Sequence, residues 1–402
     1  MKKSYIIPLI SVLIVLGIGL FLFIGSPGKG TGGPTFIPQG FLLQDEAKVR
    51  KIVVFQPGTS DRMKGRILEN ARVKPIKKLE LINAIVVNLP EQASDTARET
   101  LLSHSQVIRV DDDLIMEASP KPEGKPIPEQ PTQVVPWGIA RIKADQCWGS
   151  ATGLGVKVAV LDTGIDTNHP DLKNNIKGGV NTILSQKSYK DDNGHGTHVA
   201  GIIAAENNQI GVVGVAPQAE LYAVKVLDRK GNGWLSDIIE GLDWCIKNNM
   251  RVVNMSLGST SDNQSFHEAT HNVYLAGISI VASAGNDSDG IRYPAKYEEV
   301  IAVSAVDKNM AFASWSNSGE EIDVAAPGVD IYSTCTEPQY TSMSGTSMSA
   351  PHVTGAVALR LQAGYLSPAE VLAAVKLSAE DIGLPLDQQG TGLVDALALI
   401  TR

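Results

Sequence analysis

The sequence contains few cysteines and no excess of basic residues. Three cysteines, Cys147, Cys245 and Cys335, occur in 402 residues. So small and odd a number excludes a scaffold built on disulfides, and leaves open either one bridge with a free thiol or three buried thiols. The formal net charge of -8 argues against nucleic acid or anionic lipid as the main partner. No internal repeat is evident, and the length allows two or three globular domains.

One long apolar stretch, from Ser4 to Gly25, follows Lys2 and Lys3 at the N-terminus. It is long enough to span a bilayer, and no A-x-A-like cleavage site follows it. The paired lysines should stay in the cytoplasm, so the rest of the chain should lie outside. We therefore expect an extracytoplasmic protein. Residues 1–25 would either anchor it in the membrane as a signal anchor or be removed as a signal peptide.

Two linkers rich in glycine or proline, 26–45 and 119–133, set off a small unit at 46–118 from a large one at 134–402. In the small unit, strand and helix patterns follow the order strand, helix, strand (perhaps paired), helix, strand, and the last strand is expected over 107–117. This order predicts a ferredoxin-like α+β sandwich.

The large unit contains short, continuously apolar runs that end in Gly, Asp, Asn or Ser and alternate with helical patterns. The runs are "VKVAVLDTGI", "AELYAVKVL", "RVVNMSLG", "GISIVASAGN" and "VIAVSAV". Strands of this kind are buried on both faces, as in a parallel sheet. We therefore expect a doubly wound α/β domain, with a mostly parallel sheet flanked by helices and an active site at the carboxyl ends of the strands.

Three polar residues stand where such a site is expected. Asp162 ends an apolar strand, His195 lies among glycines where a helix should begin, and Ser347 lies at the entry of an apolar helix. Each alone is compatible with a turn, a loop or a helix cap. Together they match a nucleophilic serine, the imidazole that takes its proton and the carboxylate that orients the imidazole. Asp, His, Ser is one of the known chain orders of this triad.

The chain from about Gln133 to its end resembles the subtilisin-like serine proteases, the subtilase family. The resemblance lies in "LDTGIDTNHPDL", "HGTHVAGIIAA" and "SGTSMSAPHVTG". It implies a serine endopeptidase that cuts polypeptides through an acyl-enzyme, with Asp162 as the orienting carboxylate, His195 as general base and then acid, and Ser347 as nucleophile. It also implies that Asn286 and the backbone N–H of Ser347 form the oxyanion hole.

The resemblance further implies two backbone segments that pair with an extended substrate, and a residue at the base of the pocket for the side chain before the scissile bond. These residues are Gly231, Gly233, Ser256, Leu257, Gly258 and Arg292. Backbone pairing recognises main chain, which suits a protease of broad specificity. Arg292 in a partly desolvated pocket would favour glutamate at that position. If its side chain instead extends into solvent, it would change nothing.

A structural Ca²⁺ ion is the cofactor that the resemblance implies. Ca²⁺ binds about six to eight oxygens from carboxylates, amides and carbonyls. The positions that match the family's site are Gln133, Asp171 and Asn208 for side-chain oxygens, and Glu206, Ile210 and Val212 for backbone carbonyls.

The small unit resembles the inhibitory propeptide of these proteases, which implies that the chain is made as a zymogen with its own propeptide as an intramolecular inhibitor. A parallel sheet folds slowly because its contacts are long-range, which is consistent with a folding helper. The cut that releases the propeptide could follow Glu117 or Glu129, and the Pro-rich linker leaves the choice open.

Two alternatives remain. Residues 267–271, "HEATH", match the zinc-protease pattern H-E-x-x-H. Helical periodicity, however, directs Phe266, Ala269, Thr270, Val273 and Gly277 to the sheet and His271 outward. The other alternative is a binding or regulatory protein without activity on the same scaffold. Such a protein would be expected to lack a triad or oxyanion residue, and all four are present.

Overall fold

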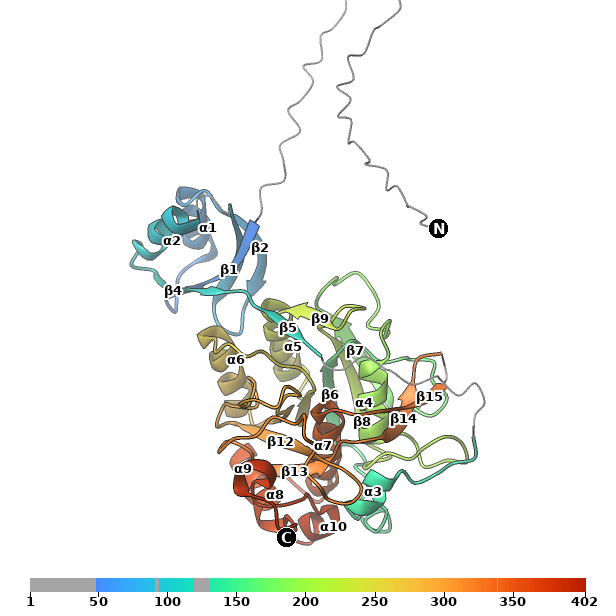
Figure 1. Ribbon diagram of the computed structural model, residues 1–402. Coiled ribbons are helices and arrows are strands. Elements are labelled where there is room, and N and C mark those ends of the chain that lie inside the picture. The colour runs from blue at the N-terminus through green and yellow to red at the C-terminus, as the bar shows by residue number, and fades with distance from the viewer. Residues whose placement is uncertain (1–47, 91–93, 119–130, 338) are drawn as a thin grey trace, which may run out of the picture. The chain divides into compact units, whose positions relative to one another are not determined.

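The computed structural model describes residues 48–90, 94–118, 131–337 and 339–402 (Figure 1). All of these belong to one compact unit. The apolar stretch expected to anchor or export the chain, the first linker and most of the second lie outside the described residues. Within the described residues, no helix combines the length and the apolar character needed to cross a membrane.

The described part of the small unit folds as the sequence predicts. Four antiparallel strands pair in the order β2-β3-β1-β4, and α1 and α2 cover one face of this sheet (Figure 1). The elements are β1 (Lys48–Phe55), α1 (Asp61–Asn70), β2 (Lys74–Leu79), β3 (Ala84–Pro90), α2 (Ser94–Leu102) and β4 (Val107–Asp112). This connection and strand order are those of a ferredoxin-like sandwich, so that prediction is confirmed.

The prediction of a single strand over 107–117 is wrong, because strand structure is interrupted at Asp113 and Leu114. Strand β4 ends at Asp112, and a separate strand β5 (Ile115–Glu117) pairs with β9 (Asn232–Trp234) of the large unit. Asp113 is buried, forms an ion pair with Arg50 at 2.8 Å and accepts a hydrogen bond from the backbone N–H of Ser236 at 2.8 Å. These contacts join the Asp113 side chain to β1 and to Ser236 of the large unit, at the point where β4 has ended and before β5 begins.

The large unit is built on a parallel sheet, as predicted. In the described residues, seven strands pair in the order β13-β12-β11-β10-β6-β8-β7, and every pairing is parallel. They are β6 (Lys157–Asp162), β7 (Ile176–Asn181), β8 (Glu220–Lys225), β10 (Val252–Met255), β11 (Ser279–Ser283), β12 (Val300–Val306) and β13 (Val324–Pro327). The sequence did not indicate β7 or β13, which are the two edge strands.

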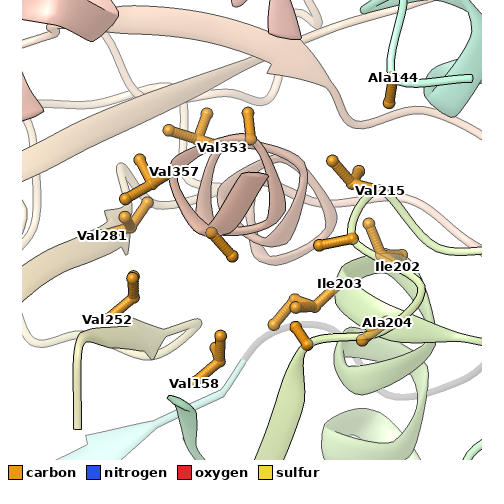
Figure 2. Packing of buried hydrophobic residues seen from close by; sticks show 14 of the residues in the cluster. Ala144, Val158, Ile202, Ile203, Ala204, Val215, Val252, Val281, Val353 and Val357 are labelled. Atoms are coloured by element: carbon orange, nitrogen blue, oxygen red, sulfur yellow. The ribbon is translucent and has the colours of Figure 1, made fainter. Parts of the chain in front are cut away.

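Different helices cover the two faces of this sheet. The main ones are α4 (His195–Ala204), α5 (Leu235–Lys247), α6 (Gln264–Leu275) and α7 (Thr346–Gln362). On β6, Val158 and Val160 pack in the cluster that contains α4 and α7, whereas Ala159 and Leu161 pack in the cluster that contains α5 and α6. Figure 2 shows Val353 of α7 within the first cluster. This alternation follows from the two-residue period of a strand.

The remaining elements surround this core. They are α3 (Trp137–Arg141), the hairpin β14 (Ile331–Cys335) and β15 (Gln339–Met343), α8 (Pro368–Ser378), α9 (Leu386–Gln389) and α10 (Ala396–Ile400). All three cysteines fall within the described ranges, and their thiols are free and buried, as one of the two alternatives expected. Burial raises the pKa of each thiol, which keeps it protonated and unreactive.

Candidate active site

A buried carboxylate and an imidazole meet at the carboxyl edge of the sheet. Asp162 is the last residue of β6, and His195 is the first residue of α4. His195 Nδ1 lies 2.8 Å from Asp162 Oδ1 and 2.9 Å from Oδ2. Burial by itself would lower the pKa of His195, but the Asp162 carboxylate outweighs it, so the pKa is raised. Nε2 of His195 is buried and makes no hydrogen bond with any described residue.

Ser347 and Asn286 line one pocket. Ser347 is the second residue of α7, and Asn286 follows strand β11. The Asn286 Oδ1 atom accepts hydrogen bonds from the backbone N–H and the hydroxyl of Thr346, both at 2.8 Å. These bonds identify the oxygen end of the amide, so Nδ2 is the end that can donate. Ser347 Oγ donates to the carbonyl of Ser256 at 3.3 Å.

Asp191 is a residue of this site that the sequence analysis missed. Its carboxylate accepts hydrogen bonds from the Thr163 hydroxyl at 2.8 Å and from the backbone N–H groups of Gly194 and Thr197, each at 3.0 Å. Asp191 thus ties the start of α4 to the residue after Asp162, and its charge also helps to raise the pKa of His195. An aspartate just before a predicted helix start was the available signal, since carboxylates favour helix N-termini.

The two segments predicted to pair with substrate lie on either side of β5. Met116 pairs with Gly233, and the N–H of Ala118 donates to the carbonyl of Gly231 at 2.9 Å. On the other side, Glu117 and Gly258 exchange both backbone hydrogen bonds, at 3.3 and 3.0 Å. A strand of the chain itself therefore lies where both segments offer main-chain partners.

A pocket beside this groove is lined by Leu257, Gly258 and Arg292, three of the residues predicted to bind substrate. Its lining residues are Glu117, Leu257, Gly258, Ser283, Gly285, Asn286, Asp287, Arg292, Thr346 and Ser347. Ser256 also contacts this region, because its hydroxyl donates to the carbonyl of Ser347 at 2.9 Å. Arg292 lies in the pocket wall and not in open solvent, since its side chain is only 19% exposed.

The six proposed calcium ligands lie in one hydrogen-bonded group. Gln133 Nε2 contacts the carbonyl of Glu206 at 2.8 Å and that of Val212 at 3.3 Å. Asn208 donates to Asp171 Oδ1 at 2.8 Å and accepts from the N–H of Ile210 at 2.7 Å. Burial raises the pKa of the Asp171 carboxyl to about 6. In the described part of the chain, no three His, Cys, Asp or Glu side chains are grouped to hold a metal ion, and this set offers mainly amide and carbonyl oxygens.

The "HEATH" residues lie elsewhere, on α6. Its buried side chains include Phe266, Ala269, Thr270 and Val273, as predicted, but the helix ends at Leu275, so Gly277 lies beyond it and that part of the prediction is wrong. His267 and His271 both contact Glu299, at 3.3 and 2.6 Å, while Glu268 pairs with Arg109 at 2.5 Å. The glutamate that a zinc protease would need as its base is therefore engaged with the small unit.

The fold and this site together indicate a class of protein, the serine hydrolases. A serine at a helix N-terminus, a fixed amide beside it and a buried carboxylate–imidazole pair lie at the carboxyl edge of a doubly wound parallel sheet. Such sheets place their active sites at this edge. A groove that pairs with extended main chain indicates further that the substrate is a polypeptide.

Comparisons with known proteins make this class specific. Residues 153–392 match the Subtilase family. The Thermostable alkaline protease of Halalkalibacterium halodurans is 50% identical over 269 residues, 66% of this chain and 73% of that protein. Subtilisin Savinase of Lederbergia lenta is 48% identical over 269 residues, 66% of this chain and 98% of that protein. Subtilisin amylosacchariticus of Bacillus subtilis subsp. amylosacchariticus is 43% identical over 309 residues, 75% of this chain and 76% of that protein.

The chain belongs to the subtilase family. It is accordingly a serine endopeptidase, a hydrolase that acts on peptide bonds.

Proposed function

We propose that this endopeptidase is exported, is stabilised by calcium and is made as a zymogen, with Asp162, His195 and Ser347 as its triad and Asn286 in its oxyanion hole. The observation that carries the proposal is the buried Asp162–His195 contact, at the same sheet edge as a pocket that Ser347 and Asn286 line. All the parts that acyl transfer requires come from the ends of strands or the starts of helices.

The proposed reaction uses these groups in two steps. Ser347 Oγ attacks the peptide carbonyl while His195 Nε2 takes the hydroxyl proton, and Asp162 holds Nδ1–H and stabilises the imidazolium. The oxyanion accepts hydrogen bonds from the N–H of Ser347 and from Asn286 Nδ2, aided by the dipole of α7. His195 then protonates the departing amine. Water, activated by the same imidazole, hydrolyses the acyl-enzyme and restores the serine.

Substrate would bind as an extended strand. Gly231 and Gly233 would pair with one edge of its backbone, and the Ser256–Gly258 segment would pair with the other. Support comes from β5, which makes these contacts with both segments. Because the contacts are to main chain, they should tolerate many side chains.

The small unit is proposed to be the inhibitor. Its strand β5 fills the groove that substrate would need, and ion pairs reinforce the contact, with Lys77 2.5 Å from Asp237 and Arg109 2.5 Å from Glu268. The alignment with subtilisin amylosacchariticus covers 309 residues, or 75% of this chain. The large unit, 134–402, has only 269 residues. The similarity to this relative therefore extends into the region before the large unit.

A cut directly after Glu117 is disfavoured by the geometry. The Glu117 carbonyl accepts a hydrogen bond from the N–H of Gly258 at 3.0 Å, so it is not presented to the oxyanion donors. The processing cut is therefore proposed to lie beyond Ala118. The alternative after Glu129 lies outside the described residues.

The proposed calcium site fits the ion by its donor types. Gln133, Asp171 and Asn208 offer side-chain oxygens next to the backbone of 206–212, which suits a hard cation. Calcium would supply positive charge that favours the ionised form of Asp171 and would hold this loop to the segment around Gln133. Export, with or without a membrane anchor, rests on residues 1–25, which lie outside the described residues.

A fluorophosphonate probe tests the function directly. The processed protein should be labelled at Ser347, because only an activated serine reacts with such a probe. Ser347→Ala should abolish both labelling and removal of the small unit, while Ser342→Ala, an exposed serine on β15, should alter neither. No labelling of a folded, processed sample would favour the binding protein without activity. Normal maturation of Ser347→Ala in a host without other proteases would refute self-processing.

A further inference from the structure

The side chain of Arg292 fills part of the pocket beside Ser347. Its backbone N–H donates to the carbonyl of Ala284 at 2.9 Å, which fixes where the side chain starts. A Cβ atom placed on Gly258 would lie 3.1 Å from Arg292 Cβ, and one on Gly285 would lie 3.0 Å from Arg292 Cγ. The aliphatic part of Arg292 therefore runs between two glycines that wall the pocket, and it takes space that a large apolar side chain of a substrate would need.

The guanidinium is paired within the protein, but imperfectly. Arg292 Nε lies 2.7 Å from Asp287 Oδ2, and the side chains are 19% and 44% exposed respectively. Despite this short distance, Nε is buried and makes no well-aligned hydrogen bond with any described residue. The contact is thus an attraction of charges without the geometry of a strong, bidentate pair. A carboxylate of better geometry could displace Asp287 at small cost.

Asp287 is held in position by the loop that carries it. The buried Asn317 side chain accepts hydrogen bonds from the backbone N–H groups of Asp287 and Asp289, at 2.7 and 3.2 Å. The same amide donates to the carbonyl of Gly290 at 2.8 Å. These bonds fix the backbone of Asp287 beside the pocket, so its carboxylate is placed to compete with an acidic side chain that enters.

We propose that Asp287 and Arg292 act together as specificity-determining residues for the substrate residue before the scissile bond, and that they select glutamate. The inference rests on the proposed function. A glutamate carboxylate replaces Asp287 on the guanidinium, while the Arg292 stem excludes large aromatic side chains and its charge repels lysine. Asp287 limits the gain, because each acidic substrate must first displace it.

The test compares kcat/KM for four peptides that differ only in having Glu, Gln, Phe or Lys before the cut. Wild type should prefer Glu to Phe. Arg292→Gln should lower the Glu/Phe ratio by about tenfold or more, because a charge-assisted bond is lost and the charge no longer opposes apolar residues. Asp287→Asn should raise the Glu/Gln ratio about fivefold, the size expected for a half-exposed charge pair. Asp289→Asn, the same change at an exposed site in the same loop, should leave both ratios unchanged.

Titration of each preparation with the fluorophosphonate probe distinguishes failure of the proposed function from failure of this inference. No reactive serine in any preparation would overturn the proposed function and this inference with it. Full labelling with the same Glu/Phe ratio in wild type and Arg292→Gln would overturn the inference alone. An unchanged Glu/Gln ratio in fully labelled Asp287→Asn would refute the competition between Asp287 and substrate.

Discussion

The two largest sheets in the described residues, one in each unit, bury their faces in different ways. The small unit packs one face, with Val53 and Phe55 of β1, against its own helices. The opposite face, with Ile52 and Val54, joins the cluster that contains α5 and α6 of the large unit. The large sheet, by contrast, is covered on both faces by helices of its own unit. The small unit therefore buries this second face against the large unit, which is consistent with the proposed role as a removable inhibitor.

The largest expected effect follows from this dependence. Residues 46–118 expressed alone should lack a stable fold, because a sheet face that contributes about 1.5–3 kcal/mol for each large side chain would be exposed. Amide dispersion in NMR spectra should be poor. It should become native-like when the large unit carrying Ser347→Ala is added. A cooperative unfolding transition of the isolated small unit would contradict the claim that its fold depends on contact with the large unit.

Acid should unfold the large unit through two buried histidines. Burial lowers the pKa of His198 on α4 to about 3 and that of His352 on α7 to about 4. Both stay neutral in the fold while the unfolded chain takes up protons near pH 6.5. The stability that they support is therefore complete above about pH 6.5 and falls as the pH drops toward 4. Each contributes a slope of about 1.4 kcal/mol per pH unit.

Urea unfolding of the Ser347→Ala chain between pH 4 and 7 measures this slope. His352→Asn should reduce the slope of unfolding free energy against pH by the contribution of one histidine, about 1.4 kcal/mol per pH unit. His104→Asn, a partly exposed histidine of the small unit, is the matched control and should retain it. The same slope in both variants would contradict the assignment.

Calcium should stabilise the large unit and not the small one, because five of the six proposed ligands lie in the large unit and the sixth, Gln133, is the linker residue directly before it. Ca²⁺ at a hundredfold excess over its Kd should add about 2.7 kcal/mol. EGTA should lower the melting temperature without instant loss of activity, since the ligands lie apart from the triad. Asn208→Ala should abolish the calcium dependence, and Asn207→Ala, its exposed neighbour, should keep it. A melting temperature indifferent to calcium would refute the site.

Sequence patterns predicted the central parts of this structure and missed parts that depend on contacts between distant residues. Continuous apolar runs predicted the buried strands and placed Asp162 at the edge where His195 meets it. Strand β7 was not predicted, because it is an edge strand with few apolar residues and it contains Gly178 and Gly179. The break at Asp113 depends on Arg50 and Ser236, far away in the sequence.

The site residues also divide into those that a sequence pattern predicts and those that depend on contacts made by the fold. Asn286 follows an apolar strand and belongs to a recognisable motif, so the pattern was sufficient to single it out. The pairing of Arg292 with Asp287 could not be predicted, because it depends on how the loop between them folds back onto Asn317. Charge alone suggested that Arg292 would be available to substrate, whereas the structure gives it an internal partner.

The smallest expected effect concerns the ion pair between the units. Glu268 and Arg109 lie 2.5 Å apart with side chains 39% and 15% exposed, so their contribution to association should be at most about 1 kcal/mol, or a fivefold change in inhibition by the small unit. Glu268→Gln should weaken inhibition by this factor at low salt and by less at high salt. Glu298→Gln, an exposed glutamate near the same helix, should have no effect.

The same variant also separates the serine and zinc mechanisms. In a zinc protease the glutamate of "HEATH" would be the general base, so Glu268→Gln would eliminate peptide hydrolysis. With Ser347 as the nucleophile, the processed enzyme should keep its activity, because the printed partner of Glu268 is Arg109 of the small unit, which processing removes. Full hydrolysis by Glu268→Gln together with weaker inhibition would place this glutamate at the contact between the units. Loss of hydrolysis that zinc chelators reproduce in the wild type would instead revive the metalloprotease.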